Sequence, residues 1–329
     1  MNLINSTRMQ VGYTMFTDKS GRDYVVVVIK GSYSMPMRPN EKPELLETQV
    51  PLVTCDEFTG EPGVSAPLHE NDFAPRKPRC DVLLNGSAYA PGGKPVERVI
   101  VGLQVGSLRK SFDVVGGRTW KAGKLSLGVS AIEPFVTQAI SYDVAFGGVD
   151  RTSQDPIKHS WYLSNHVGVG YFVNSDPKAV DGKPMPNTEE TGRPISSPRA
   201  NYKPMAFGPV ARAWQPRAKF AGTYDERWLE KTAPFLPADF DDRYFQTAPE
   251  DQQMNYPVGG EQITLFNMTA EGRTTFPLPE LDMPVVFFPK SGDIQEVHAV
   301  VDTIILEPDK NQILLIWRAS LPLRRNLFE

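Results

Sequence analysis

Few side chains in this sequence have the types and spacing that catalysis needs. The chain has four histidines, at His69, His159, His166 and His298. His159 and His166 are seven positions apart in a loop-like segment, without the four-residue helical spacing of a zinc pair. His298 falls in a strand-like pattern, which favours a core or surface role. Ser107 and Lys110 match S-x-x-K, but the alternation around them predicts a strand, whereas the serine of penicillin-recognising enzymes begins a helix.

The densest acidic group is Asp239, Asp241 and Asp242 in the sequence LPADFDDRYF. Hard cations such as Mg²⁺ and Ca²⁺ need several converging oxygens, which this group could supply. Sugar hydrolysis is a second possibility, because it needs two carboxyls roughly 5–9.5 Å apart and Asp239 and Asp241 would share one face of a strand. Aspartates in turns commonly bond nearby backbone N–H groups, and Arg243 adjoins the cluster. We favour capping or pairing with arginine, and expect no metal, no cofactor and no catalytic residue.

A segment of a different kind runs from Ala206 to Gln253. It interleaves aromatic residues, Arg, Asp, Gly and Pro with no period of a helix or strand. Flat amphipathic side chains bury much area at low entropic cost, so Trp and Arg are typical anchors of interfaces. The partner-binding candidates are Phe207, Arg212, Trp214, Arg217, Tyr224, Asp225 and Trp228. The alternative is an irregular core in which Arg–Asp pairs satisfy the loop backbone, and both interpretations can hold together.

Length and charge narrow the class of protein. The 329 residues, of which 40% are hydrophobic and 22% charged, predict a globular chain. The 35 basic and 39 acidic residues give a net charge of −4, which argues against binding nucleic acid through a basic face. The N-terminus lacks the pattern of a secretory signal, and the longest strongly apolar run, Tyr24–Ile29, is far shorter than the ~20 residues that span a bilayer. We therefore expect a soluble, cytoplasmic protein without membrane contact.

The elements that must position these side chains are predicted to be strands. The 30 prolines and 26 glycines exclude long helices and favour a mainly β fold. Residues 22–35 are β-branched and predict a buried strand. Between residues 80 and 115, the segments Asp81–Tyr89, Val96–Val105 and Ser107–Val115 predict a β-meander. Such spacing favours an antiparallel sandwich or barrel-like sheets with long Pro/Gly-rich loops and few short helices.

Two local elements stand out in the second half of the chain. Asp225–Lys231 predicts a helical turn, with Thr223 or Asp225 as its N-cap and Pro234 beyond its end. Glu296–Leu306 and Asn311–Ser320 predict a hairpin around a Pro-Asp turn.

The chain divides into three predicted parts, which could also form one continuous domain. Residues 1–148 are β-rich, 149–253 are irregular and rich in aromatic residues, Pro and Gly, and 254–329 return to strands and end in the hairpin. We expect the long excursion that begins at residue 149 to pack on its own aromatic residues, or else to clasp a partner. These aromatics are Trp161, Tyr162, Tyr171, Phe172, Tyr202, Phe207 and Trp214.

A set of short motifs, spread over roughly residues 20–290, carries a resemblance to a known family. The motifs are Asp72–Pro78 with Asp81 and Val82, Gly86 and Ala88, Tyr142–Gly148, Phe207–Pro209, Trp214 with Arg217, Ala221–Asp225 with Trp228, Leu236–Asp241, and Ala248-Pro249 with Asp251-Gln252. With these residues in this order, the sequence resembles the DUF2169 family, found in bacterial type VI secretion gene clusters. One departure occurs at Asn165-His166, where that family usually has Asn-Pro.

The resemblance implies a non-enzymatic adaptor, or chaperone, in the bacterial cytoplasm. Such a protein binds the N-terminal region of a type VI secretion effector and helps load it onto VgrG or a PAAR-like spike tip. It implies no catalytic residue, and its motifs could be scaffold, partner surface or both. Two alternatives stay open: a carbohydrate-binding or carbohydrate-active β-protein that uses Asp239 and Asp241 as an acid pair, and a structural component secreted with the spike.

Overall fold

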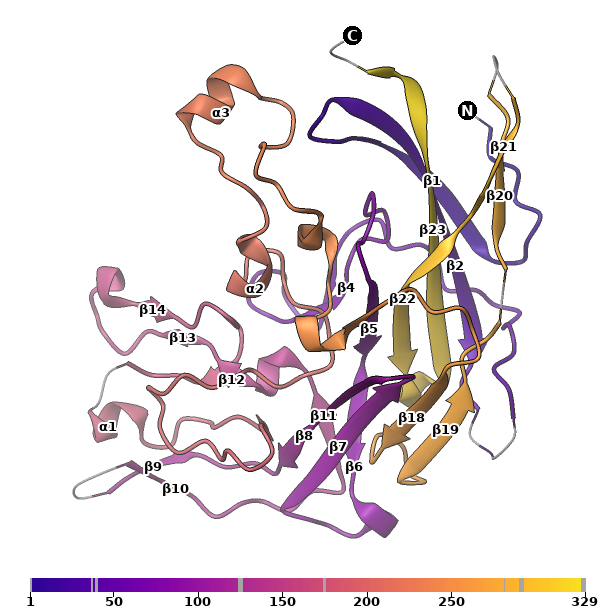
Figure 1. Ribbon diagram of the computed structural model, residues 1–329. Helices are drawn as coiled ribbons and strands as arrows, with labels where there is room; N and C mark the ends of the chain where they lie inside the picture. The colour runs from indigo at the N-terminus through magenta and orange to yellow at the C-terminus, as the bar shows by residue number, and fades with distance from the viewer. Residues whose placement is uncertain are drawn as a thin grey trace.

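The computed structural model describes residues 2–36, 38, 41–123, 127–173, 176–280, 282–289 and 293–326, with side chains to residue 323. Two larger sheets form its centre (Figure 1). The first contains, in order across the sheet, β1 (Gln10–Thr17), β2 (Arg22–Ser34), β23 (Gln312–Asn326), β22 (Val300–Glu307), β5 (Cys80–Leu84) and β17 (Gln253–Met254). The second contains β16 (Thr188–Glu189), β8 (Leu108–Val115), β7 (Arg98–Val105), β18 (Gln262–Phe266) and β19 (Arg273–Pro277). Neither sheet closes into a barrel within the described ranges, and the predicted mainly β, largely antiparallel class is confirmed.

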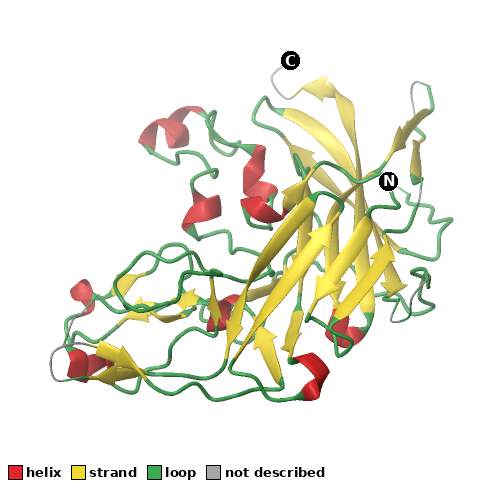
Figure 2. Cartoon of the chain, turned by 60° about the horizontal axis from the view of Figure 1, so that its bottom comes forward, coloured by secondary structure: helices red, strands yellow, loops and turns green. Residues whose placement is uncertain are grey.

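The remaining strands form two-stranded pairs around this centre. They are β3 (Glu57–Phe58) with β4 (Pro67–His69), β6 (Gly86–Tyr89) with β11 (Thr137–Ile140), β9 (Trp120–Ala122) with β10 (Leu127–Val129), β12 (Phe146–Gly147) with β15 (Val169–Gly170), β13 (Val149–Asp150) with β14 (Ser160–Trp161), and β20 (Pro284–Phe287) with β21 (Gln295–His298). The helices are short, and Figure 2 shows them on the connections between strands. They are α1 (Pro177–Val180), α2 (Gln215–Ala218), α3 (Glu226–Lys231) and the 3₁₀ turns Pro91–Gly93, Tyr142–Val144, Pro156–Lys158, Asp242–Phe245, Glu250–Gln252 and Pro308–Lys310.

The six-stranded sheet is buried on both faces, which explains the unbroken apolar run of β2. Val27 and Ile29 face the main core, while Val26 and Val28 face a second cluster on the opposite side. A strand covered on both faces needs no polar alternation, so the sequence of β2 reads as a continuous β-branched stretch. Residues from the long loop between β2 and β5, Phe73 among them, pack on the second face.

One main core joins the two large sheets. Val82, Ile304 and Leu315 of the first sheet and Phe112 and Leu265 of the second belong to the same buried cluster. The cluster also extends from Met9 to Trp317 along the chain. All three predicted parts of the sequence therefore contribute to one core.

The predicted three-stranded meander over residues 81–115 is wrong in its first strand. β7 and β8 do form a hairpin, but β5 lies in the other sheet, parallel to β22. The chain leaves that sheet at Asn85, whose N–H donates to the carbonyl of Leu306 (2.9 Å). The next residue is Gly86. A glycine fits at this position because a Cβ there would lie 2.9 Å from the ring of Pro308. A parallel pairing between segments more than 200 residues apart leaves no local pattern, so the sequence could not reveal it.

The long excursion packs partly on its own aromatic residues, as predicted. Tyr162 and Tyr202 belong to a separate cluster, against which Tyr171 and Phe172 pack. Phe207 and Trp214 instead join the main core, and Trp161 is exposed, so the prediction is wrong for these three.

The two predicted local elements are confirmed with adjusted ends. The C-terminal hairpin consists of β22 and β23, while residues 295–298 pair with β20 instead. Asn311 adopts a left-handed conformation (φ 52°) that closes the turn after Pro308. Asp225 caps α3 by accepting a hydrogen bond from the N–H of Trp228 (2.8 Å). Within the ranges that the structure describes, no helix is long and apolar enough to cross a membrane.

Glu307, at the end of β22, forms a buried ionic cluster at this turn. It lies 3.2 Å from His69 Nε2 and 2.9 Å from Lys310 Nζ, and it accepts a hydrogen bond from Gln312. Burial alone would raise the pKa of Glu307, but the hydrogen bonds from His69, Lys310 and Gln312 outweigh it and lower the pKa to about 2.

We expect this cluster to make folding sensitive to acid. Because the folded-state pKa of Glu307 is below the unfolded value of about 4.3, its stabilisation is present above that pH and is lost as the pH falls toward 2. The full effect is about 3 kcal/mol in the free energy of unfolding. Denaturant unfolding at pH 5 and pH 3 should therefore show a smaller loss of stability for Glu307→Gln than for the wild type. Equal losses in both proteins would contradict the assignment.

Candidate partner-binding site

Residues 219–243 form an arm that carries α3 away from both large sheets (Figure 1). The base of the arm is fixed to the turn between β1 and β2. There Lys19 Nζ donates to the carbonyl oxygens of Phe240 (3.2 Å) and Ala238 (3.5 Å). Phe245, just beyond the arm, packs edge-on against Phe16 of β1 at a centroid distance of 6.0 Å.

The tip of the arm exposes apolar and aromatic side chains. Leu229 is 66% exposed and Tyr224 is 53% exposed. Trp228 is half-buried and supports the tip, because its Nε1 donates to the carbonyl of Phe235 (2.8 Å) and its ring packs edge-on against Tyr224 at 4.7 Å. Apolar and aromatic groups held on a projecting element are typical of a protein contact surface.

Asp239 and Asp241 hold the arm in shape and are not arranged as an acid pair. Asp239 accepts from the N–H (3.0 Å) and the hydroxyl (2.7 Å) of Thr223, and these bonds lower its pKa. Asp241 pairs with the guanidinium of Arg243 (2.6 Å), which lowers the pKa of Asp241 as well. A general acid in sugar hydrolysis needs a raised pKa. The predicted preference for capping and arginine pairing fits these contacts, and the carbohydrate alternative loses its catalytic pair.

Three of the predicted anchors lie inside the protein. Phe207 and Trp214 are part of the main core, where Trp214 packs edge-on against Tyr142 at 5.3 Å. Arg217 is buried and donates to the carbonyls of Val210 (2.7 Å) and Tyr244 (2.8 Å) as well as to Glu70 (2.9 Å). For these three residues the structure matches the alternative interpretation, in which arginine satisfies a buried loop backbone.

The other four anchors lie nearer the surface. Arg212 is exposed and pairs with Glu70 (2.6 Å) and Asp56 (3.2 Å). Tyr224, Asp225 and Trp228 belong to the arm. The structure therefore brings three of the seven predicted residues together at one accessible place.

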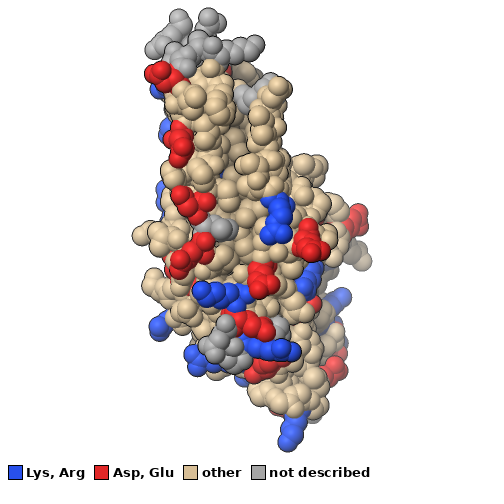
Figure 3. Space-filling view, turned by 90° about the vertical axis from the view of Figure 1, so that its right-hand side faces the viewer, with Lys and Arg blue, Asp and Glu red and all other residues tan. Residues whose placement is uncertain are grey.

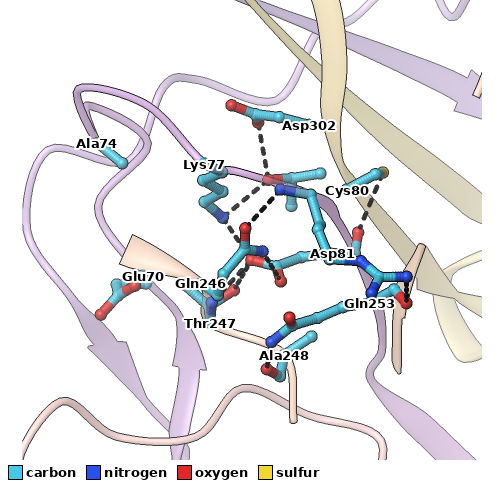
Figure 4. A network of polar contacts seen from close by, with 12 residues as sticks. Glu70, Ala74, Lys77, Cys80, Asp81, Gln246, Thr247, Ala248, Gln253 and Asp302 are labelled. Carbon is cyan, nitrogen blue, oxygen red and sulfur yellow. Dashed lines mark hydrogen bonds and ion pairs between the residues drawn. The ribbon is translucent and has the colours of Figure 1, made fainter. Parts of the chain in front are cut away.

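The motif around residues 72–81 forms a buried polar network (Figure 4). The Asp81 carboxylate accepts from Lys77 Nζ (2.8 Å), Gln246 Nε2 (2.6 Å) and both the N–H and the hydroxyl of Thr247. Lys77 also donates to the Thr303 hydroxyl (2.9 Å). Every member is buried, so this part of the motif ties loops to the sheet and is closed to a partner. The roles of Gln246, Thr247 and Thr303 could not be inferred from the sequence, because each depends on a pairing across more than 150 residues.

A second projection, the β20–β21 hairpin, was not anticipated from the sequence. It carries the exposed apolar residues Val286, Phe288 and Ile294. Figure 3 shows few basic side chains on the upper half of this side of the molecule, with acidic ones mainly along one border. The short apolar run Pro284–Phe287 was the available signal.

A pocket of about 300 Å³ opens beside the excursion. Its wall includes three tyrosines, three prolines and two basic side chains: Tyr142, Tyr162, Tyr202, Pro204, Pro216, Pro249, Arg193 and Lys203. No described residue that lines it is an Asp, Glu, His or Cys. No group of three or more such residues is close enough to hold a metal ion anywhere in the described ranges.

The histidines are dispersed. His69 belongs to the Glu307 cluster, His298 pairs with Asp282 on the exposed hairpin, and His159 contacts the carbonyl of Ser153. His166, at the departure from the family motif, lies 6.4 Å from the ring of Trp214. Its pKa is lowered by burial.

Comparison with known proteins finds a family match. A family model described as "Uncharacterized protein conserved in bacteria (DUF2169)" matches residues 20–318. No curated protein and no solved structure matches the chain.

Removal of the Asp81 carboxylate should destabilise the fold severely. Asp81→Ala leaves the Lys77 ammonium buried without its partner, and breaking a buried ion pair in this way typically costs about 3–5 kcal/mol in the free energy of unfolding. Asp239→Ala is the control, because it removes a carboxylate that also accepts hydrogen bonds within the chain but is exposed. Denaturant unfolding that shows similar stabilities for the two variants would refute a structural role for the network.

Trp214→Ala should act on the core and not on a contact surface. We expect a loss of about 3–5 kcal/mol in the free energy of unfolding, as is typical when a buried tryptophan is truncated. The measurement is again denaturant unfolding, and a variant as stable as the wild type would mean that Trp214 is accessible.

Proposed function

Because the chain belongs to the DUF2169 family, we propose that it is a non-enzymatic bacterial adaptor that binds a type VI secretion effector. It helps to load the N-terminal region of that effector onto VgrG or a PAAR-like spike tip, and it acts in the cytoplasm. The observation that carries the binding role is the arm of residues 219–243, which exposes Leu229 and Tyr224. Lys19 holds the base of this arm through the carbonyl oxygens of Ala238 and Phe240.

The polar groups of the site support binding over catalysis. The carboxylates of the arm are engaged with Thr223 and Arg243, and the tyrosine- and proline-lined pocket offers no carboxylate for acid or base chemistry. An adaptor must also release its cargo. A small contact surface with a polar surround suits a transient complex better than an extensive apolar one does.

The identifying experiment is capture of partners from the native bacterium with this chain as bait, read by mass spectrometry. Recovery of one effector together with VgrG or a PAAR-like protein would support the proposal and identify the cargo. Recovery of neither, from cells that express the neighbouring secretion genes, would refute it. The secreted fraction separates an adaptor from a spike component, because an adaptor stays in the cell.

Leu229→Ser should weaken capture of the recovered effector without loss of stability. Burying a leucine side chain contributes about 1.5–3 kcal/mol, so its removal from the contact should weaken binding by at least about tenfold. Val258→Ser is the matched control, since Val258 is 89% exposed and lies outside the arm. Calorimetry with the purified effector measures both affinities. Unchanged affinity for Leu229→Ser would remove the arm from the interface.

A further inference from the structure

Three of the four outer strands of the large sheets carry features that prevent further strand pairing. β17 and β16 are each two residues long, and β19 contains Arg273 and Pro277. β1 is the exception. It has eight residues, QVGYTMFT, with no charge, no proline and no irregularity in its register with β2. Natural proteins protect edge strands by shortness, charge, proline or bulges, because an unprotected edge pairs with another strand.

The register shows which backbone groups of β1 face outward. The N–H of Asp18 donates to the carbonyl of Arg22 (2.9 Å), so these two residues form a hydrogen-bonded pair. The next pair along the strands is Thr17 with Asp23. Hydrogen-bonded pairs alternate along an antiparallel ladder. The even-numbered residues of β1 therefore direct their backbone groups to β2. The odd-numbered residues direct theirs away from the sheet, and they are Val11, Tyr13, Met15 and Thr17.

These outward groups are free within the described part of the chain. Apart from the pairing with β2, no backbone N–H of Gln10–Thr17 donates to another described residue. One carbonyl, that of Met15, accepts a long contact from the Thr14 hydroxyl (3.4 Å). The edge thus offers a regular row of donors and acceptors.

The side chains beside this row are apolar and accessible. Met15 is 50% exposed and Tyr13 is 39% exposed, and both lie on the same face of the strand as Val11, which packs on the main core. Side chains directly opposite each other on paired strands stabilise the pairing, and aromatic and aliphatic pairs do so well.

β1 also leads to the arm. Its last residues adjoin the turn whose Lys19 holds the carbonyl oxygens of Phe240 and Ala238, and Phe16 packs against Phe245. A segment that lies along β1 therefore reaches the base of the arm at one end.

We propose that β1 binds an extended segment of the cargo as an additional strand of the six-stranded sheet. This proposal rests on the proposed function, because it names how the cargo is held. The cargo segment has no charged residue opposite Tyr13 or Met15. It carries apolar side chains at alternate positions, on the face of the sheet that Tyr13 and Met15 share. Backbone hydrogen bonds supply the affinity of such strand addition, and the alternate side chains supply its specificity. The direction of β1 toward the arm favours a cargo that contacts both over a second copy of this chain.

The test is Met15→Pro, which removes one outward donor and adds steric bulk at the free edge. Since the N–H of Met15 points away from β2, proline there removes no bond of the native ladder, and edge strands tolerate it at such positions. The probe is the effector recovered with the wild-type chain, purified. We expect its affinity to fall by about tenfold or more, as for a lost hydrogen bond combined with a clash.

Thr275→Pro on β19 is the matched control. The N–H of Asn267 donates to the carbonyl of Gly272, which places Arg273, Thr275 and Pro277 at outward positions of that ladder. Thr275→Pro therefore makes the same change on an edge that is already protected, and it should bind cargo like the wild type. If Met15→Pro unfolds, Met15→Lys and Thr275→Lys replace the pair, because a charge at the edge opposes strand addition without changing the backbone.

Amide hydrogen exchange gives the second readout. Binding of the effector should slow exchange in residues 10–17 and leave β19 unchanged. Normal affinity of the Met15 variant with no protection of residues 10–17 would overturn the proposal while leaving the adaptor role intact. If residues 10–17 become protected from exchange as the protein concentration rises, without effector, the proposal would be overturned. The edge of β1 would then pair with a second copy of this chain. If the wild-type chain captures no effector at all, both proposals fail.

Discussion

The segments on either side of the sheet strand β5 are held together by one buried carboxylate, that of Asp81. It lies on β5, which is placed between β22 and the short outer strand β17 in the six-stranded sheet. Burying a charge is costly unless it is paired and hydrogen-bonded, and Asp81 is satisfied from Lys77 on one side and from Gln246 and Thr247 on the other. The loop before β5 and the segment after the arm are thereby both bound to the carboxylate oxygens of Asp81. The arm emerges from the second of these segments, so its place on the surface follows from this network.

The same solution recurs at two other places where an irregular segment covers the six-stranded sheet. Lys30 of β2 pairs with Asp72 (3.0 Å), and Asp72 also accepts the N–H of Val53 (2.7 Å). Arg318 of β23 pairs with Asp302 and donates to the carbonyls of Asp72 and Ala74. Loops cannot satisfy their own backbone groups once they are buried, so charged side chains from the strands provide the missing partners. Proline-rich segments, in which each proline lacks an N–H donor, can then serve as a second layer on the sheet.

Local chemistry decided which features could be predicted from the sequence. The β-branched run of β2, the Asp225 cap of α3 and the Pro-Asp turn before β23 are each determined by neighbouring residues, and each was predicted. The parallel pairing of β5 with β22 and the Asp81 network depend on residues far apart in the chain, and neither leaves a periodic signal. The candidate site divides in the same way. Composition singled out Trp214 and Trp228 equally, but burial placed the first in the core and left the second to support an exposed tip.

In the proposed adaptor, recognition and scaffold use different residues. The motif residues Asp72, Lys77, Asp81 and Gln252 all have buried partners within the chain, so substituting them to suit a cargo would disturb the fold. Tyr13, Met15 and Leu229 have no such buried partners. Their side chains are between 39% and 66% exposed, and none of them makes a polar side-chain contact in the described structure. A protein that holds a cargo temporarily needs contact residues that can change without loss of stability. The free edge of β1 adds a further advantage, because backbone hydrogen bonds accept many sequences while alternate side chains select among them. The strand edge of β1 and the projecting arm, joined at Lys19, are thus two accessible parts of the described structure on which a cargo could select without disturbing the buried networks.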